Sequence, residues 1–133
     1  MAARILVIED NAANLELVRY LLAASGHTVL MARDGAQGVA VARRERPDLI
    51  VCDLQMPVMD GYQVLAQLRE NADAYAPVVV AVTAFSMPRD REKVLTAGFD
   101  GYLSKPIAPE TFVADIEAFL PAGLRPARPA TDT

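Results

Sequence analysis

The sequence predicts an α/β protein in which a doubly wound, five-stranded parallel sheet is covered by helices on both faces. Short runs dominated by apolar residues recur five times, as expected for strands buried on both faces. Segments with helical spacing of apolar residues follow each run, which gives the order (βα)5. The chain has 133 residues, of which 53% are hydrophobic, and this suffices for the core of one domain.

The five expected strands follow from these runs. The runs lie at residues 5–8, 28–31, 49–52 and 78–82, and a weaker fifth lies at residues 101–104. Because parallel strands end at the same edge of a sheet, and ligands of such sheets bind outside that edge, we expect the functional residues there.

The first three helices begin at recognisable signals. The first follows Asn11 and carries apolar residues at positions 15, 18, 21 and 22. Asp34 and Asp60 are expected to cap the second and third helices. Each is followed three residues later by a glutamine, Gln37 or Gln63, that can reach back to the cap.

The last two helices are marked by proline and glycine. Ser86 and Pro88 are expected to begin the fourth helix, which ends near Gly98. Pro109 suits the first turn of the fifth helix.

The composition changes near residue 120, and this predicts the domain organisation. Residues 121–133 include three prolines and few large apolar side chains. We expect one folded domain over residues 1–120 and a flexible, proline-rich tail over residues 121–133.

Charge and cysteine content exclude several classes of function. The net charge is −4 without a basic cluster, so direct binding of nucleic acid or an anionic membrane is not expected. No apolar run approaches the ~18 residues of a membrane helix. The single cysteine, Cys52, permits no internal disulfide and favours a cytoplasmic protein. We expect Cys52 in the core and His27 on the surface.

Polar side chains follow four of the expected strands. These residues are Glu9 and Asp10 after the first strand, Asp53 after the third, Thr83 after the fourth and Lys105 after the fifth. If the strands are parallel and adjacent, the set converges on three carboxylates, one hydroxyl and one ammonium group.

This combination of groups indicates phosphoryl chemistry. Three carboxylates in one cleft repel one another, and a divalent cation removes that conflict. Oxygen ligands favour Mg²⁺ or Mn²⁺ over Zn²⁺. Lys105 and Thr83 suit the oxygens of a phosphoryl group, and Asp53, on the middle strand, is the natural acceptor.

The sequence resembles the receiver domain of bacterial two-component response regulators. Four segments carry the resemblance, and they lie at residues 7–11 (VIEDN), 51–61 (VCDLQMPVMDG), 81–84 (AVTA) and 102–106 (YLSKP). The match spans the chain from residue 4 to about 120. It implies the flavodoxin-like strand order 2-1-3-4-5. The resemblance extends to regulators that consist of a receiver alone, and similar segments occur in the receivers of hybrid sensor kinases.

The resemblance also implies a role for each residue at the expected site. Asp53 matches the phosphorylated aspartate, and Glu9 and Asp10 match the acid pair that organises Mg²⁺ together with Asp53. Gln55 matches a position whose backbone carbonyl binds the metal, so that its side chain has no required type.

The residues of the last two strands match the switch of the family. Thr83 matches the switch hydroxyl and Lys105 the lysine that binds the phosphoryl group. Pro106 matches a proline that follows a cis peptide bond. Tyr102 matches the aromatic residue that changes rotamer on activation.

The family's activity implies a signalling switch rather than a turnover enzyme. A histidine kinase or a histidine phosphotransfer protein would dock on the first helix, including Asn14, Leu15 and Val18. A downstream protein would bind the face of the fourth helix, fifth strand and fifth helix, because no output domain follows. The chain is then expected to be a monomer or a weak dimer.

Several alternatives stay open at this point. The chain can be a receiver-like module that no longer cycles, or the receiver of a hybrid histidine kinase. A phosphatase with an aspartate nucleophile needs a second carboxylate two residues later, where this sequence has Gln55. Individually, the acid pair could cap the first helix, and Tyr102 could serve packing alone.

Overall fold

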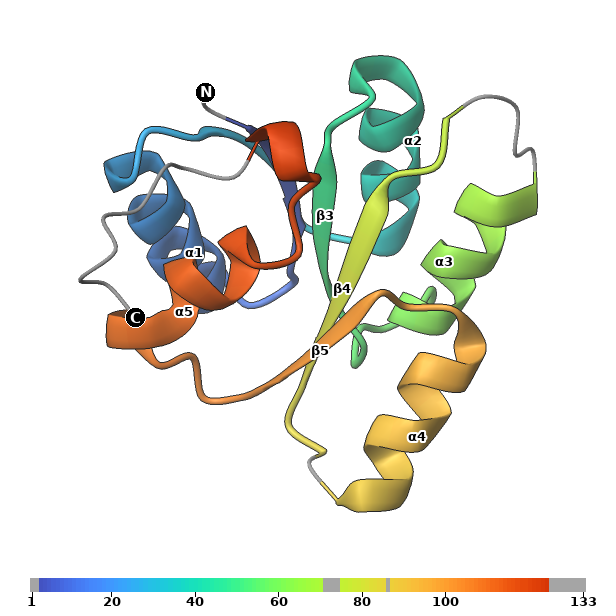
Figure 1. The fold of residues 1–133 in the computed structure, drawn as a ribbon. Coiled ribbons are helices and arrows are strands. Elements are labelled where there is room, and N and C mark those ends of the chain that lie inside the picture. The colour runs from blue at the N-terminus through green and yellow to red at the C-terminus, as the bar shows by residue number, and fades with distance from the viewer. Residues whose placement is uncertain (1–2, 71–74, 86, 125–133) are drawn as a thin grey trace.

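Five parallel strands alternate with five helices in the computed structural model, which describes residues 3–70, 75–85 and 87–124 (Figure 1). The strands are β1 (Arg4–Ile8), β2 (Thr28–Ala32), β3 (Leu49–Asp53), β4 (Val78–Thr83) and β5 (Gly101–Ser104). Their order in the sheet is β2-β1-β3-β4-β5, and neighbouring strands are parallel. The predicted flavodoxin-like fold is confirmed.

The helices begin and end close to the predicted positions. They are α1 (Ala12–Ala24), α2 (Gly35–Glu45), α3 (Gly61–Glu70), α4 (Pro88–Ala97) and α5 (Pro109–Glu117). Before α3, Asp60 and Gln63 each accept a hydrogen bond from the other's backbone N–H, at 2.9 Å. Asp34 caps α2 as predicted, but the side chain of Gln37 accepts from the N–H of Arg33 instead of that of the cap.

α4 begins at Pro88 and ends near Gly98, as predicted, and a short turn follows the last helix. Ser86 lies outside the described residues, and Met87 is the N-cap of α4. Gly98 ends this helix with φ 112°, a backbone conformation that favours glycine. The predicted tail begins with a 3-10 turn, η1 (Ala122–Leu124), whose Leu124 packs against the core. The rest of the predicted tail, residues 125–133, lies outside the described residues.

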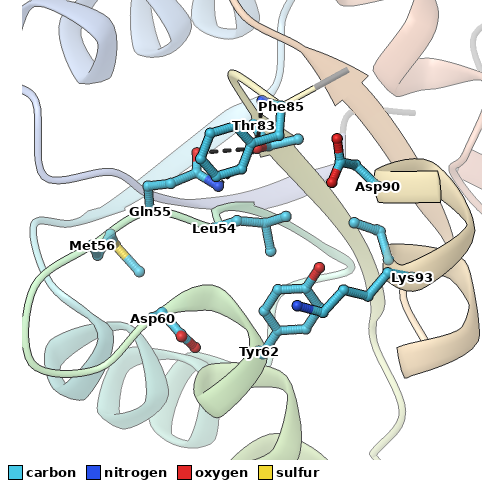
Figure 2. A pocket seen from close by; sticks show the side chains of 10 residues that line it. Leu54, Gln55, Met56, Asp60, Tyr62, Thr83, Phe85, Asp90 and Lys93 are labelled. Atoms are coloured by element: carbon cyan, nitrogen blue, oxygen red, sulfur yellow. Dashed lines mark hydrogen bonds between the residues drawn. The ribbon is translucent and has the colours of Figure 1, made fainter. Parts of the chain in front are cut away.

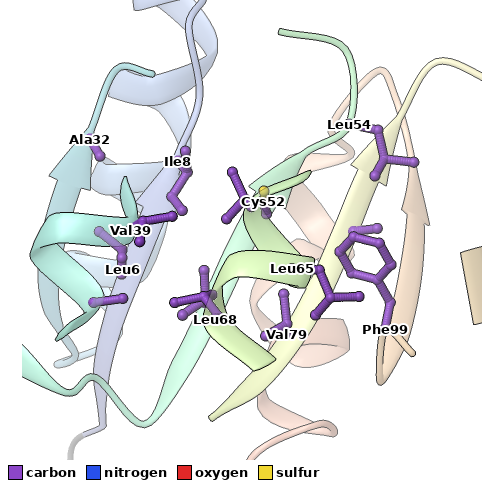
Figure 3. Packing of buried hydrophobic residues seen from close by; sticks show 14 of the residues in the cluster. Leu6, Ile8, Ala32, Val39, Cys52, Leu54, Leu65, Leu68, Val79 and Phe99 are labelled. Atoms are coloured by element: carbon purple, nitrogen blue, oxygen red, sulfur yellow. The ribbon is translucent and has the colours of Figure 1, made fainter. Parts of the chain in front are cut away.

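Helices cover both faces of the sheet, so the core has two layers. One layer lies between the sheet and α1 and α5, and the other between the sheet and α2, α3 and α4 (Figure 1). Figure 3 shows the second layer, where Leu65 and Phe99 lie over the strands. Cys52 lies in this layer, as predicted, and burial raises the pKa of its thiol. Within the described residues, no helix is both long and apolar enough to cross a membrane.

β2 is less buried than the sequence prediction requires. Thr28 and Met31 are exposed, the latter to 44%, and Ala32 is the fully buried residue of the strand. β2 lies at the edge of the sheet, where side chains meet fewer neighbours than in the central strands. An apolar run thus predicted the strand correctly but not its burial on both faces.

His27 is buried, and the prediction of a surface position is wrong. Its side chain is 1% exposed. Nδ1 accepts a hydrogen bond from the N–H of Ala3 at 3.1 Å, and Nε2 lies 2.8 Å from a carboxylate oxygen of Glu117 in α5. The last turn of α5 reaches this end of the sheet, which a strand-by-strand interpretation of the sequence does not reveal.

The outer face of α1 also differs from the prediction. Leu15 and Val18 are buried, with exposures of 7% and 4%, and therefore cannot form part of a docking surface. The periodicity that predicts the helix places these residues on the stripe that faces the sheet. Asn14 is partly exposed, and Tyr20 is 62% exposed.

Candidate functional site

Three carboxylates meet where β1 and β3 end. Glu9 and Asp10 follow β1, and Asp53 is the last residue of the neighbouring strand β3. Ligand oxygens of these three residues all lie within 4.8 Å of one another. Glu9 and Asp53 are buried, whereas Asp10 is exposed. The topology therefore brings together the three acidic residues that the sequence singled out.

Lys105 joins this cluster from the end of β5. Its Nζ lies 3.1 Å from a carboxylate oxygen of Glu9 and 3.1 Å from one of Asp53. Its backbone N–H donates to the carbonyl of Thr83 at 2.8 Å, which fixes the loop to the end of β4. The peptide bond between Lys105 and Pro106 is cis, as the resemblance implies.

Burial and the neighbouring charged groups shift the pKa of two members of the cluster. Burial raises the pKa of Glu9, and Asp53 raises it further through a hydrogen bond and its charge. The N–H of Asn11 and the ammonium of Lys105 oppose this shift, and the resulting pKa is about 7. Burial alone would lower the pKa of Lys105, but its hydrogen bonds to Glu9 and Asp53 outweigh burial and raise it.

The cap of α1 is Asn11 and not the acid pair. The side chain of Asn11 accepts a hydrogen bond from the N–H of Asn14 at 2.9 Å. Glu9 accepts from the N–H of Asn11 at 3.1 Å, which aims this carboxylate at the cluster from the turn before the helix. Helix capping therefore does not account for the exposed Asp10.

The backbone after Asp53 is packed closely against the start of α3. A Cβ atom on Gly61 would lie 2.7 Å from the carbonyl oxygen of Asp53, so only glycine allows this approach. The N–H of Gln55 donates to a carboxylate oxygen of Asp53 at 3.2 Å. Both contacts fix the position of the carboxylate at the end of β3.

Thr83 is fully buried at the end of β4, and its hydroxyl contacts the side chain of Gln55 (Figure 2). The Gln55 amide nitrogen lies 2.8 Å and its amide oxygen 3.0 Å from the Thr83 hydroxyl oxygen. Sequence reasoning missed this side chain, because it assigned only a backbone carbonyl to Gln55. The register places the two residues near each other, because β3 and β4 pair with Asp53 opposite Val82, but the direction of the Gln55 side chain has no signal in the sequence.

Tyr102 is linked to the same loop. Its hydroxyl donates to the backbone carbonyl of Phe85, and its partly buried ring packs against the core layer under α4. The N–H of Phe85 in turn donates to the hydroxyl of Thr83 at 3.0 Å. A chain of hydrogen bonds thus connects Thr83 to Tyr102.

A cavity of about 340 Å³ lies beside this loop (Figure 2). Leu54, Gln55 and Phe85 line one side, and α4 contributes Lys93. The ammonium of Lys93 lies 4.9 Å from the centre of the ring of Tyr62, a residue of α3 that also lines the cavity.

The donor set of the cluster fits a hard divalent cation. Glu9, Asp10 and Asp53 offer only carboxylate oxygens, and the described part of the chain adds no histidine or thiol ligand to them. Oxygen ligands of this kind suit Mg²⁺, whereas Zn²⁺ in proteins favours nitrogen and sulfur. The acidic triad is therefore of the Mg²⁺-binding type.

Comparisons with known proteins agree with this site. The polar-differentiation response regulator DivK of Brucella anthropi is 37% identical over 120 residues, which make up 90% of this chain and 98% of that protein. The chemotaxis response regulator CheY4 of Vibrio cholerae superimposes with a TM-score of 0.84 and 28% identity, over 90% of this chain and 100% of the other.

A third relative was solved with its metal bound. The receiver domain of the sensor histidine kinase PA1611 from Pseudomonas aeruginosa has a magnesium ion coordinated in its active-site cleft. It is 32% identical, with a TM-score of 0.79, over 90% of this chain and 98% of that one. Residues 5–117 match the family model for the response regulator receiver domain. The chain therefore belongs to the receiver domains of response regulators, a family of signalling switches in two-component systems.

Proposed function

We propose that this chain is a single-domain response regulator in which Asp53 accepts a phosphoryl group from a phosphohistidine on a partner protein. One observation carries the proposal. The buried Asp53 carboxylate stands at the end of the middle strand, within 4.8 Å of two other carboxylates and 3.1 Å from the ammonium of Lys105. Charge of both signs is thus concentrated at one carboxylate.

The transfer forms a bond between an Asp53 oxygen and phosphorus and breaks the P–N bond of the phosphohistidine. The imidazole nitrogen leaves with the electron pair of that bond. The ammonium of Lys105 is paired with Asp53 and is close enough to bind the incoming phosphoryl oxygens. The hydroxyl of Thr83 is the donor for a phosphoryl oxygen from the adjacent strand.

Glu9, Asp10, Asp53 and the backbone carbonyl of Gln55 would hold Mg²⁺, with Mn²⁺ as the alternative. When bound, the cation supplies the positive charge that lets three carboxylates and a phosphoryl group lie together. Burial and, to a smaller extent, the neighbouring Asp53 raise the pKa of Glu9, so that this carboxylate is costly to ionise in the chain without a metal cation.

Two surfaces are proposed for the partners. The histidine kinase or phosphotransfer protein docks on the exposed side of α1, which carries Tyr20 and is continuous with the end of β1. The downstream protein binds the face of α4, β5 and α5, where Met87 and Leu95 are exposed. Tyr102 lies on β5 in this face and is the proposed switch residue.

We propose further that the protein is cytoplasmic and is a monomer or weak dimer. It signals through phosphorylation-dependent contacts with other proteins. Its activity is limited to its own phosphorylation and dephosphorylation. The alternatives are a receiver-like module that no longer cycles and a receiver that belongs to a hybrid histidine kinase.

Intact-mass analysis after incubation with Mg²⁺ and acetyl phosphate tests the proposal. We expect one phosphoryl adduct in the wild-type chain, no adduct without Mg²⁺ and no adduct in Asp53→Asn. Asp115→Asn, an exposed acid on α5, is the matched control and keeps the adduct.

The outcomes separate the alternatives. An adduct that persists in Asp53→Asn at the wild-type rate would sink the assignment of the acceptor. A folded wild-type chain that gains no adduct from acetyl phosphate or from a phosphorylated histidine phosphotransfer domain would favour the module that no longer cycles.

A further inference from the structure

The side chain of Gln55 is hydrogen-bonded to the hydroxyl of Thr83, which the proposed mechanism needs for a phosphoryl oxygen. Its amide atoms lie 2.8 Å and 3.0 Å from the hydroxyl oxygen of Thr83, and the N–H of Phe85 donates to the same oxygen at 3.0 Å. A hydroxyl has one proton to donate and two lone pairs to accept with. The three contacts therefore use the whole hydrogen-bonding capacity of Thr83.

Thr83 and Gln55 differ in burial, and this difference decides which of them can lose its hydrogen bond without cost. Thr83 is 0% exposed, whereas Gln55 is exposed. If the hydroxyl proton of Thr83 turns to a phosphoryl oxygen on Asp53, it leaves the Gln55 amide. The released amide can be hydrated where it stands, so the exchange leaves no buried group without a partner.

The contact between Gln55 and Thr83 is connected to Tyr102 through Phe85. Phe85 is joined to Thr83 through its N–H and to Tyr102 through its carbonyl. If the Thr83 oxygen also moves toward the phosphoryl group, the first of these bonds breaks, and the Phe85 peptide that holds Tyr102 is then free to turn. The 340 Å³ cavity that Gln55 and Phe85 line gives both side chains room for this movement.

We propose that the carboxamide of Gln55 is a latch that holds Thr83, and through Phe85 also Tyr102, in the unphosphorylated arrangement. The inference rests on the proposed function and adds a means of regulation to the same site. Gln55 acts as a positioning residue, because its side chain competes with the phosphoryl group for one proton. Its substitution leaves the backbone carbonyl proposed for the metal in place.

Amide hydrogen exchange in the Mg²⁺-free, unphosphorylated chain tests the latch directly. In Gln55→Ala, the Phe85 amide should exchange about fivefold faster, since one net hydrogen bond holds Thr83 in place. The amides of β4, such as that of Val80, should keep their wild-type protection. Gln67→Ala, on α3, is the matched control and should leave the Phe85 amide unchanged. A merely structural role for Gln55 would instead raise exchange throughout the sheet.

A titration with beryllium trifluoride and Mg²⁺ tests the effect on the switch. This phosphoryl analogue should bind Gln55→Ala about fivefold more tightly than the wild-type chain, because no latch has to be broken. Unchanged or weaker binding by Gln55→Ala would overturn the latch, and weaker binding would mean that the carboxamide assists the phosphorylated state.

The two measurements separate the latch from the proposed function. If neither chain binds the analogue, the proposed function fails, and the latch fails as a regulator with it. An unchanged Phe85 amide in Gln55→Ala overturns the latch even where both chains bind the analogue and Asp53→Asn does not.

Discussion

The two ends of the sheet both carry charged side chains, but these side chains serve different purposes. At the amino end, side chains satisfy the first backbone N–H groups of the strands. Asp48 accepts from Arg4 at 2.8 Å, and Asp100 accepts from Val79 at 2.8 Å. His27 completes this set through the N–H of Ala3.

At the carboxyl end, the carboxylates face one another. Glu9 and Asp53 share one lysine, and Asp10 adds a third negative charge within 4.8 Å. Counted formally, three carboxylates and the ammonium of Lys105 leave −3 + 1 = −2. At the amino end the side chains are therefore paired with backbone N–H groups of the fold itself, whereas the carboxyl end has an excess of formal negative charge that a ligand can balance.

The largest effect is expected at the amino end, from His27→Ala. This change removes the acceptor for the Ala3 N–H and a buried partner of Glu117, and it should lower the free energy of unfolding by about 3 kcal/mol. Urea denaturation measures the loss. Phosphorylation of the folded variant by acetyl phosphate should continue, because the site lies at the other end of the sheet.

A double-mutant cycle of His27→Ala with Glu117→Ala isolates the pair. We expect a coupling free energy of about 1 kcal/mol or more. A loss below about 1 kcal/mol in His27→Ala alone would show that the amino end is not held by this pair.

The next-largest effect is the pH dependence of Mg²⁺ affinity at the carboxyl end of the sheet. Because the pKa of Glu9 is about 7, Mg²⁺ must displace a proton below that pH. The affinity for Mg²⁺ should therefore rise about tenfold from pH 6 to pH 8. Glu9→Gln should bind Mg²⁺ more weakly, with little dependence on pH over this range.

The same pKa sets the sign of the stability change without metal. The folded chain keeps the Glu9 proton up to about pH 7, whereas the usual value is 4.5. This group therefore contributes stability that is fully present below pH 4.5 and is lost as the pH rises to about 7. A Mg²⁺-free wild-type chain that gained stability relative to Glu9→Gln over this interval would contradict the pKa.

Asp10→Asn should have a smaller effect on the free energy of unfolding, opposite in sign to that of His27→Ala. Without Mg²⁺, this change relieves repulsion and should raise the free energy of unfolding by about 1 kcal/mol. With Mg²⁺, the wild-type chain gains stability from binding and the variant gains much less, so that their order reverses during a titration. Thermal unfolding at increasing Mg²⁺ concentration measures both.

The matched change at the amino end is Asp48→Asn. It weakens the acceptor for the Arg4 N–H, so it should destabilise the chain at every Mg²⁺ concentration. If Asp10→Asn also destabilised the chain without Mg²⁺, the excess negative charge at the carboxyl end would not be a source of strain.

The sequence predicted the carboxyl end better than the amino end for a physical reason. Strand order and direction alone bring Glu9, Asp53 and Lys105 to one edge. The apolar runs predict parallel strands, and the family resemblance implies their order in the sheet. The position of His27 depends instead on where α5 ends over the sheet, and this comes from packing between distant segments. The same limit applies to β2, whose exposure follows from its place at the edge.

The Gln55 side chain marks a second limit. Its contact with Thr83 depends on the direction of a side chain in a loop, which neither periodicity nor spacing encodes. Leu15 and Val18 show the opposite case. Their burial follows from the helical period, and the resemblance to a docking helix led to a wrong assignment that the residues themselves argue against.

The smallest effect on stability is expected at two residues with positive φ, one at each end of the sheet. Val58, in the loop after Asp53, has φ 67° and is fully exposed, and Arg46, at the end of α2, has φ 47°. Val58→Gly should raise the free energy of unfolding by about 0.5–1 kcal/mol, because relief of a β-branched residue in this region exceeds the entropy cost of glycine. Arg46→Gly gains less relief, because arginine is not β-branched, and loses a cation–π contact with Tyr75, at 5.4 Å, so it should be close to neutral. Urea denaturation with an unchanged m-value checks both, and a loss of stability in Val58→Gly would mean that the Val58 side chain contributes to the fold.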